Sequence, residues 1–169
     1  MKRRVRWIAC SAALVLGASA FWQGLQVTRD CVYSDKVSRI VRFAVVTDLH
    51  STWYGEAQSG LIDAITREDP DAVLLAGDIV DDERPRDAAK AFLQAVIQKY
   101  PTYYVLGNHE FRIPAPEEVK DWARDLGVTV LDGTGETVTL NDQTVRICGV
   151  DDPACGTLSW QSQFDTVCR

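Results

Sequence analysis

The sequence lacks the short motifs that mark several common classes of binding domain. None of its five cysteines forms a Cys-x-x-Cys pair, which argues against a zinc knuckle or a thioredoxin-type redox site. No Gly-x-Gly-x-x-Gly or Gly-Lys-Ser/Thr segment follows the first expected strand, which excludes a nucleotide-binding Rossmann module. An excess of basic residues is missing too, since 18 Lys and Arg stand against 24 Asp and Glu. The net charge of -6 has the wrong sign for binding a nucleic-acid backbone.

Long apolar runs are also scarce. Residues 8–21 carry no charge, but a membrane-spanning helix needs a longer run of roughly 20 residues. A basic start at residues 2–6 and an Ala-Ser-Ala triplet at residues 18–20 predict a secretory signal peptide over residues 1–20. An uncleaved signal anchor and a plain buried helix are the alternatives. Either the signal or the anchor would make the protein exported or membrane-anchored, with its folded part at the extracytoplasmic face.

After this segment, the sequence predicts a linker over residues 21–38 and one globular domain over residues 39–169. A hydrophobic content of 46% is enough to bury a core. In an exported domain, Cys148 and Cys155 could form a disulfide across the loop between them. Apolar, β-branched runs typical of buried strands occur at 40–47, 72–76, 102–106, 128–131, 137–140 and 144–150.

Segments with helical spacing separate the first four of these strands. Each segment has an apolar stripe on one face and ends near a proline or a glycine. The stripes are Leu61, Ile62 and Ile65; Ala89, Phe92, Leu93 and Val96; and Val119, Trp122 and Leu126. This alternation predicts an α/β fold, in which βαβ units form a parallel-rich sheet. The last two strands are expected to form a hairpin at Asn141-Asp142.

A polar cluster follows each of the first three strands. The clusters are Asp48-Leu49-His50, Gly77-Asp78 and Gly107-Asn108-His109-Glu110. Their first polar residues are equally spaced along the chain, by about the 30 residues of one βαβ unit. Because the carboxyl ends of parallel strands meet at one edge of a sheet, these side chains should converge there.

The residue types in these clusters suit a metal site. Carboxylate and amide oxygens bind hard cations, and imidazole adds affinity for zinc, iron or manganese. The glycines before Asp78 and Asn108 permit positive φ or a close backbone approach where each strand turns into its loop. Metal-assisted hydrolysis uses such a site, because two ions can hold a hydroxide and the phosphoryl oxygens together.

Each cluster taken alone also has an ordinary structural interpretation. Asp48 could cap the following helix, and Gly77-Asp78 could be a simple turn. Glu110 could orient His109 or be an exposed loop acid. Asp81 and Asp82 should solvate the loop after the second strand rather than belong to the site. Asp151 and Asp152 end a later strand and should form a turn, although a strand that ends in two acids also looks like part of such a site. The three clusters together, in this order and spacing, favour the metal site.

The order D-L-H, G-D-I-V-D, G-N-H-E resembles the calcineurin-like metallophosphoesterase family. This resemblance implies a phosphatase-type hydrolase with two divalent metal ions, Mn, Zn or Fe. By the same resemblance, Asp48 and His50 would bind the first metal, Asp78 would bridge both, and Asn108 would bind the second. His109 would be catalytic, as a residue that contacts the phosphoryl group or protonates the leaving oxygen.

The match to the family covers residues of about 40–150 and is incomplete. Family members supply a further histidine and a G-H-x-H segment, but this chain has only two histidines. We therefore expect about half of the four-layer αββα sandwich, truncated at the C-terminus and inactive by itself. A non-catalytic remnant with weak metal binding is the alternative. A phosphorylated small molecule is an expected substrate, because bound cations would reverse the local negative charge. The exported or membrane-anchored position suggests a lipid-linked phosphoester as the other substrate, and no nucleic-acid partner is expected.

Overall fold

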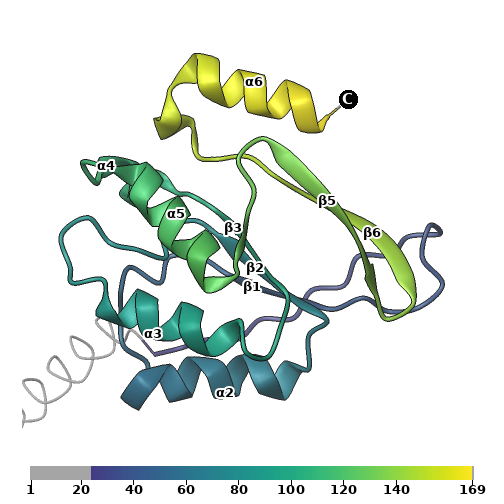
Figure 1. Ribbon diagram of the computed structural model, residues 1–169. Coiled ribbons are helices and arrows are strands. Elements are labelled where there is room, and N and C mark those ends of the chain that lie inside the picture. The colour runs from purple at the N-terminus through teal and green to yellow at the C-terminus, as the bar shows by residue number, and fades with distance from the viewer. Residues whose placement is uncertain (1–23, 169) are drawn as a thin grey trace, which may run out of the picture. The chain divides into compact units, whose positions relative to one another are not determined.

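The computed structural model of the protein describes residues 24–168 (Figure 1). The chain divides into two compact units, residues 1–30 and residues 31–169. The predicted signal segment, residues 1–20, lies outside the described residues. No helix within residues 24–168 is both long and apolar enough to cross a membrane.

The second unit is built on a four-stranded sheet in the order β1-β2-β3-β4. All three strand pairs are parallel, which confirms the predicted α/β class. The strands are β1 (Phe43–Val46), β2 (Ala72–Ala76), β3 (Thr102–Val105) and β4 (Thr129–Val130). In the register of the sheet, Val46 pairs with Leu75 and Ala76 with Val105, so the first three strands end at one edge.

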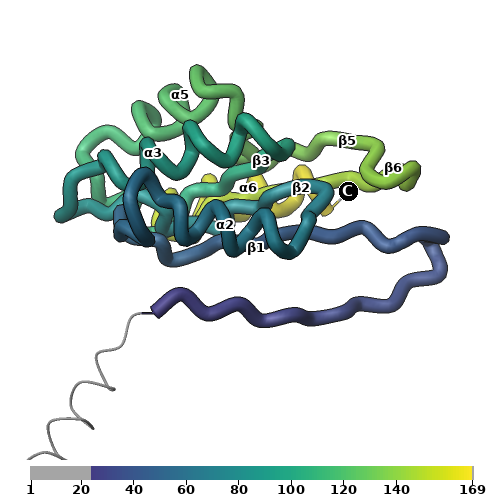
Figure 2. The backbone as a smooth tube through the Cα atoms, turned by 90° about the horizontal axis from the view of Figure 1, so that it is seen from below, coloured from purple at the N-terminus to yellow at the C-terminus, as the bar shows by residue number. Residues whose placement is uncertain are grey.

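One face of the sheet packs against helices α2 (Ser59–Glu68), α3 (Asp87–Val96) and α5 (Pro116–Leu126). These helices lie side by side (Figures 1 and 2). Their predicted apolar stripes form the main core with alternate strand residues such as Val73, Leu75 and Tyr104. Helix α5 begins with a proline and ends at Gly127, whose φ of 100° gives the expected left-handed stop.

The other face of the sheet packs against an antiparallel hairpin of β5 (Thr134–Leu140) and β6 (Gln143–Gly149). The predicted turn at Asn141-Asp142 is present, with φ values of 47° and 61° that suit a two-residue hairpin. Tyr103 of β3 and Leu131, which follows β4, belong to a smaller buried cluster with Ile147 of the hairpin. Near β1 this face is open, since Val45 is 62% exposed.

Several elements were not expected from the sequence. They are two helices, α4 (Asn108–Arg112) and α6 (Thr157–Val167), and two 3-10 turns, η1 (Glu56–Gln58) and η2 (Pro153–Cys155). Helix α6 has no buried residue, so its weak amphipathic pattern gave little signal. The suggested disulfide is also absent, because the cysteines of the described part are all free.

A buried ion pair holds the loop after β6 to helix α5. Asp151 is 1% exposed and Lys120 is 4% exposed, and their charged atoms lie 2.9 Å apart. Asp151 also accepts a hydrogen bond from the backbone N–H of Leu106 at the end of β3. Burial acts to lower the pKa of Lys120, but the Asp151 and Glu117 carboxylates outweigh it and raise that pKa. Asp151, which we expected in a simple turn, is therefore a buried residue that stabilises the fold.

We predict that Lys120→Met lowers the free energy of unfolding by about 3–5 kcal/mol, because it leaves the Asp151 carboxylate buried without its cation. The double variant Lys120→Met/Asp151→Asn removes that charge and should recover part of the loss. Urea unfolding of the purified chain measures both. A single variant as stable as the original chain, or a double variant with no recovery, would contradict this role for the ion pair.

Candidate metal centre

The loop after β1 carries Asp48 and His50 in left-handed backbone, with φ values of 56° and 46°. Such values are uncommon outside glycine and are enriched at functional sites. Hydrogen bonds to the loop after β2 hold this conformation: the Asp48 N–H donates to Gly77 O at 3.3 Å and the His50 N–H to Asp78 O at 2.9 Å. The loops after β1 and β2 therefore lie side by side, with the side chains of Asp48, His50 and Asp78 close to one another.

Gly77 and Gly107 allow the loops after β2 and β3 to meet. Gly77 has a φ of 88°, and a Cβ there would stand 2.8 Å from Gly107 Cα. Gly107 is extended, but a Cβ on it would lie 2.5 Å from Asp78 N. Positive φ and close approach, the two roles anticipated for these glycines, are thus both found: Gly77 has both, and Gly107 has the close approach alone.

Asp48, His50 and Asp78 converge at this edge of the sheet. Each offers one ligand atom, and these three atoms all lie within 4.8 Å of one another. The Nε2 atom of His50 is 3.6 Å from Asp48 Oδ1. Its Nδ1 atom is buried and forms no hydrogen bond with the described residues, but it lies 3.4 Å from Asp81 Oδ2. The two ring nitrogens of His50 therefore face different carboxylates, Asp48 and Asp81.

Asn108 lies beside this group as the first residue of α4. In the amide orientation that satisfies both of its polar ends, its nitrogen donates to Asp78 Oδ2 at 3.1 Å. Its oxygen accepts a hydrogen bond from Arg112 Nη2 at 3.0 Å. The structure therefore brings Asn108 to the predicted place, but its oxygen, the ligand atom expected from the sequence, faces a guanidinium group.

His109 reaches the same edge. Its ring centroid lies 4.4 Å from that of His50, and its backbone N–H donates to Asp78 Oδ1 at 2.9 Å. Its Nδ1 atom is 2.6 Å from Asp82 Oδ1, and its Nε2 atom is 3.2 Å from Arg112 Nη1. Burial acts to raise the pKa of Asp82, but the hydrogen bond and charge of His109 outweigh it and lower that pKa.

The expectation that Asp81 and Asp82 only solvate their loop is wrong. Asp82 pairs with His109, and Asp81 offers a ligand atom within 4.8 Å of atoms of both His50 and His109. Asp81 also accepts from the backbone N–H groups of Glu83 and Arg84, which shapes the loop. The sequence signal for Asp81 was its place as the last residue of the G-D-I-V-D motif, whereas Asp82 had no signal beyond its closeness to Asp78.

Glu110 has neither of the two roles considered for it, since it is fully buried and its carboxylate hydrogen-bonds to other residues than His109. Its Oε2 atom accepts from the backbone N–H groups of Asp78 (3.0 Å) and Gly107 (2.9 Å). Its Oε1 atom accepts from Val80 N–H (2.8 Å) and from the Tyr104 hydroxyl (2.6 Å). One buried carboxylate thus joins the loop after β2 to the loop after β3.

Tyr104 completes this buried network from strand β3. Burial raises the pKa of its phenol well above the ordinary value, and the neighbouring Glu110 carboxylate raises it further. The phenol therefore stays protonated and serves as a hydrogen-bond donor. The network needs that donor, because a buried carboxylate is stable only when its oxygens have partners.

The fold and this cluster define a class: an α/β protein with a candidate metal centre at the carboxyl edge of a parallel sheet. The family described as calcineurin-like phosphoesterase matches residues 41–158. The chain belongs to that family, which confirms the resemblance seen in its three motifs. Comparison with curated proteins gave no match.

We predict that Glu110→Gln destabilises the chain more than Tyr104→Phe does. The phenylalanine variant loses one hydrogen bond to a carboxylate, worth about 1.5–3 kcal/mol. The glutamine amide instead turns an N–H₂ toward backbone N–H groups, and each donor left without an acceptor costs roughly 1–3 kcal/mol. Urea unfolding of both variants tests this order. Equal stability of the two variants would show that the Glu110 carboxylate does not organise the loops.

Proposed function

We propose that this chain provides the first-metal ligands and the proton donor of a metal-dependent hydrolase of phosphoester bonds. The family supports a phosphoesterase, and the convergence of Asp48, His50 and Asp78 on one point carries the proposal. These residues come from two loops that backbone hydrogen bonds hold together. The site is therefore organised by the fold itself.

The residues present fit a first divalent ion. Two carboxylates and one imidazole are suitable ligands for manganese, zinc or iron. The site holds four carboxylates, those of Asp48, Asp78, Asp81 and Asp82. Their negative charges repel one another, and a bound cation would relieve this repulsion. When bound, divalent ions in such a site supply a hydroxide at neutral pH and neutralise charge on the phosphoryl group.

The fit to a second ion is poorer. Asp78 would bridge both ions in the proposed two-metal arrangement, and Asn108 would be the other ligand. The Asn108 oxygen is engaged by Arg112, so the amide would have to turn before it could bind a cation. We therefore propose that the second ion is held more weakly than the first, and that the chain alone hydrolyses phosphoesters slowly or not at all.

His109 is suited to proton transfer. Asp82 accepts a hydrogen bond from the Nδ1 atom in the tautomer that this contact favours, and this contact fixes the orientation of the ring. The Nε2 atom then points toward the outside of the cluster, where Arg112 meets it. When protonated, that nitrogen could donate a proton to the leaving oxygen of a phosphoester.

We propose a phosphorylated small molecule or a lipid-linked phosphoester as the substrate, and an exported or membrane-anchored location. The amino-terminal sequence pattern supports the location and, through it, a lipid-linked phosphoester, and bound cations would reverse the local negative charge that otherwise disfavours a phosphorylated ligand. The second candidate function is that of a non-catalytic remnant that binds one ion weakly. The engaged Asn108 oxygen favours it, together with the fact that both histidines of the chain already lie in the cluster.

We predict that the purified chain binds Mn²⁺ and that Asp78→Ala abolishes this binding, whereas His109→Ala retains it. Asp78 is a proposed ligand, and its loss should exceed the roughly 10- to 100-fold weakening seen when only an outer-sphere partner is removed. His109 should act on the leaving group alone, so any turnover should fall by about 10²- to 10⁴-fold. Electron paramagnetic resonance of free Mn²⁺ and an aryl phosphate assay measure the two effects.

Two outcomes would change the proposal. No Mn²⁺ binding by the original chain, or loss of Mn²⁺ from the His109→Ala variant, would refute the roles assigned to these residues. Robust metal-dependent turnover by the chain alone would show that Asp81, Asp82 or other residues complete the second site.

A further inference from the structure

We propose that Arg112 binds the phosphoryl group of the substrate. This inference rests on the proposed function, because it concerns the open side of the same cluster. Arg112 is the last residue of helix α4, which begins with Asn108 and His109. Its side chain is exposed, so an incoming ligand can reach it.

The guanidinium group of Arg112 already holds two acceptors of the site. Nη1 lies 3.2 Å from His109 Nε2, and Nη2 donates to the Asn108 oxygen at 3.0 Å. Since Asp82 engages the Nδ1 atom of the His109 ring, Nε2 is free to accept from the arginine. Two neighbouring N–H donors of one planar group therefore face the place where a phosphoryl group would meet His109.

Arg112 forms no direct ion pair within the described part of the chain, although its charge is near enough to the Asp82 carboxylate to help lower the pKa of that acid. Within residues 24–168 no carboxylate lies within 4.0 Å of Arg112, whereas Arg124 contacts both Asp121 (3.1 Å) and Asp132 (2.9 Å). A guanidinium so close to a cation-binding cluster would repel a bound divalent ion. An anion between the two would be attracted to both, and the oxygens of a phosphoryl group suit the paired donors of arginine.

This placement suggests how substrate completes the site. When phosphoryl oxygens accept the two N–H donors, the Asn108 oxygen and His109 Nε2 lose their arginine partner. The Asn108 oxygen can then turn toward a cation, and Nε2 can face the leaving oxygen. Phosphate and metal should therefore bind cooperatively, each raising the affinity of the chain for the other.

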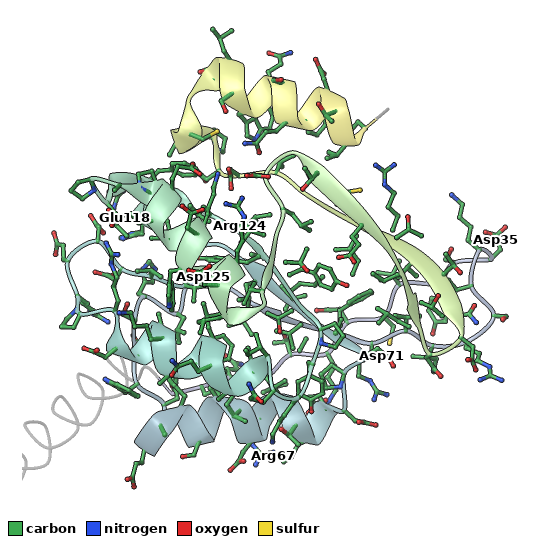
Figure 3. The ribbon with its side chains drawn as sticks, viewed as in Figure 1. Asp35, Arg67, Asp71, Glu118, Arg124 and Asp125 are labelled. Atoms are coloured by element: carbon green, nitrogen blue, oxygen red, sulfur yellow. The ribbon has the colours of Figure 1, made fainter. Side chains whose placement is uncertain are left out.

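The test measures binding of inorganic phosphate to the Mn²⁺-loaded chain by titration calorimetry, and it needs no turnover. We expect Arg112→Gln to weaken phosphate binding by roughly 10- to 100-fold, the effect of losing a charge-assisted hydrogen-bonded pair. The matched control is Arg67→Gln, which removes the same charge from the last turn of α2 (Figure 3). Arg67 lies near the loop that enters β2, at the opposite end of the sheet from the cluster. This control should bind phosphate as the original chain does.

Each alternative result has a distinct meaning. If the original chain does not bind Mn²⁺, the proposed function fails. If the chain binds Mn²⁺ but Arg112→Gln and Arg67→Gln bind phosphate equally, only the role of Arg112 is overturned. A variant Arg112→Gln with unchanged phosphate affinity but tighter Mn²⁺ binding would show that the arginine instead takes the place of a second cation. Circular dichroism of each variant checks that the fold is retained.

Discussion

The candidate site depends on one buried carboxylate, that of Glu110, which fastens two loops to each other. Its oxygens accept hydrogen bonds from the backbone N–H groups of Asp78, Val80 and Gly107. These N–H groups belong to loops after different strands, so the loops cannot separate without leaving buried donors unpaired, at a cost of about 1–3 kcal/mol each. The positions of Asp78 and of the helix that begins at Asn108 follow from this network.

The hydrogen bonds of Glu110 hold the two loops together against the repulsion between the acidic side chains that these loops carry. Asp48, Asp78, Asp81 and Asp82 lie in a small region, and their mutual repulsion would push flexible loops apart. Left-handed backbone at Asp48, His50 and Asp78 adds local strain. A fold that maintains such an arrangement without a structural need for it is typical of a functional site, where local rules are broken and neighbouring interactions compensate.

Much of the fold follows from local patterns. The strand at 72–76 was predicted with its observed bounds because apolar residues fill it and Pro70 and Gly77 flank it. The hairpin turn followed from Asn141-Asp142, since these residue types tolerate positive φ. Asp48, His50 and Asp78 were found because equal spacing in βαβ units brings strand ends together.

Other features could not be read from the chain. Glu110 looks like any loop acid until its burial is known, and Asp82 depends on the path of a loop after β2. Asp151 is 45 residues from Leu106, so no local pattern connects them. The orientation of the Asn108 amide depends on Arg112, three residues beyond His109 on a short helix that has no clear periodicity. These residues act through tertiary contacts, and only the structure brings them together.

Anomalous diffraction from a crystal of the chain grown with Zn²⁺ would show whether Asp48, His50 and Asp78 bind a metal ion. We expect an anomalous peak within metal-ligand distance, about 2.0–2.2 Å, of a carboxylate oxygen of Asp48 and Asp78 and a ring nitrogen of His50. A peak elsewhere on the chain, or none at this edge of the sheet, would contradict this expectation.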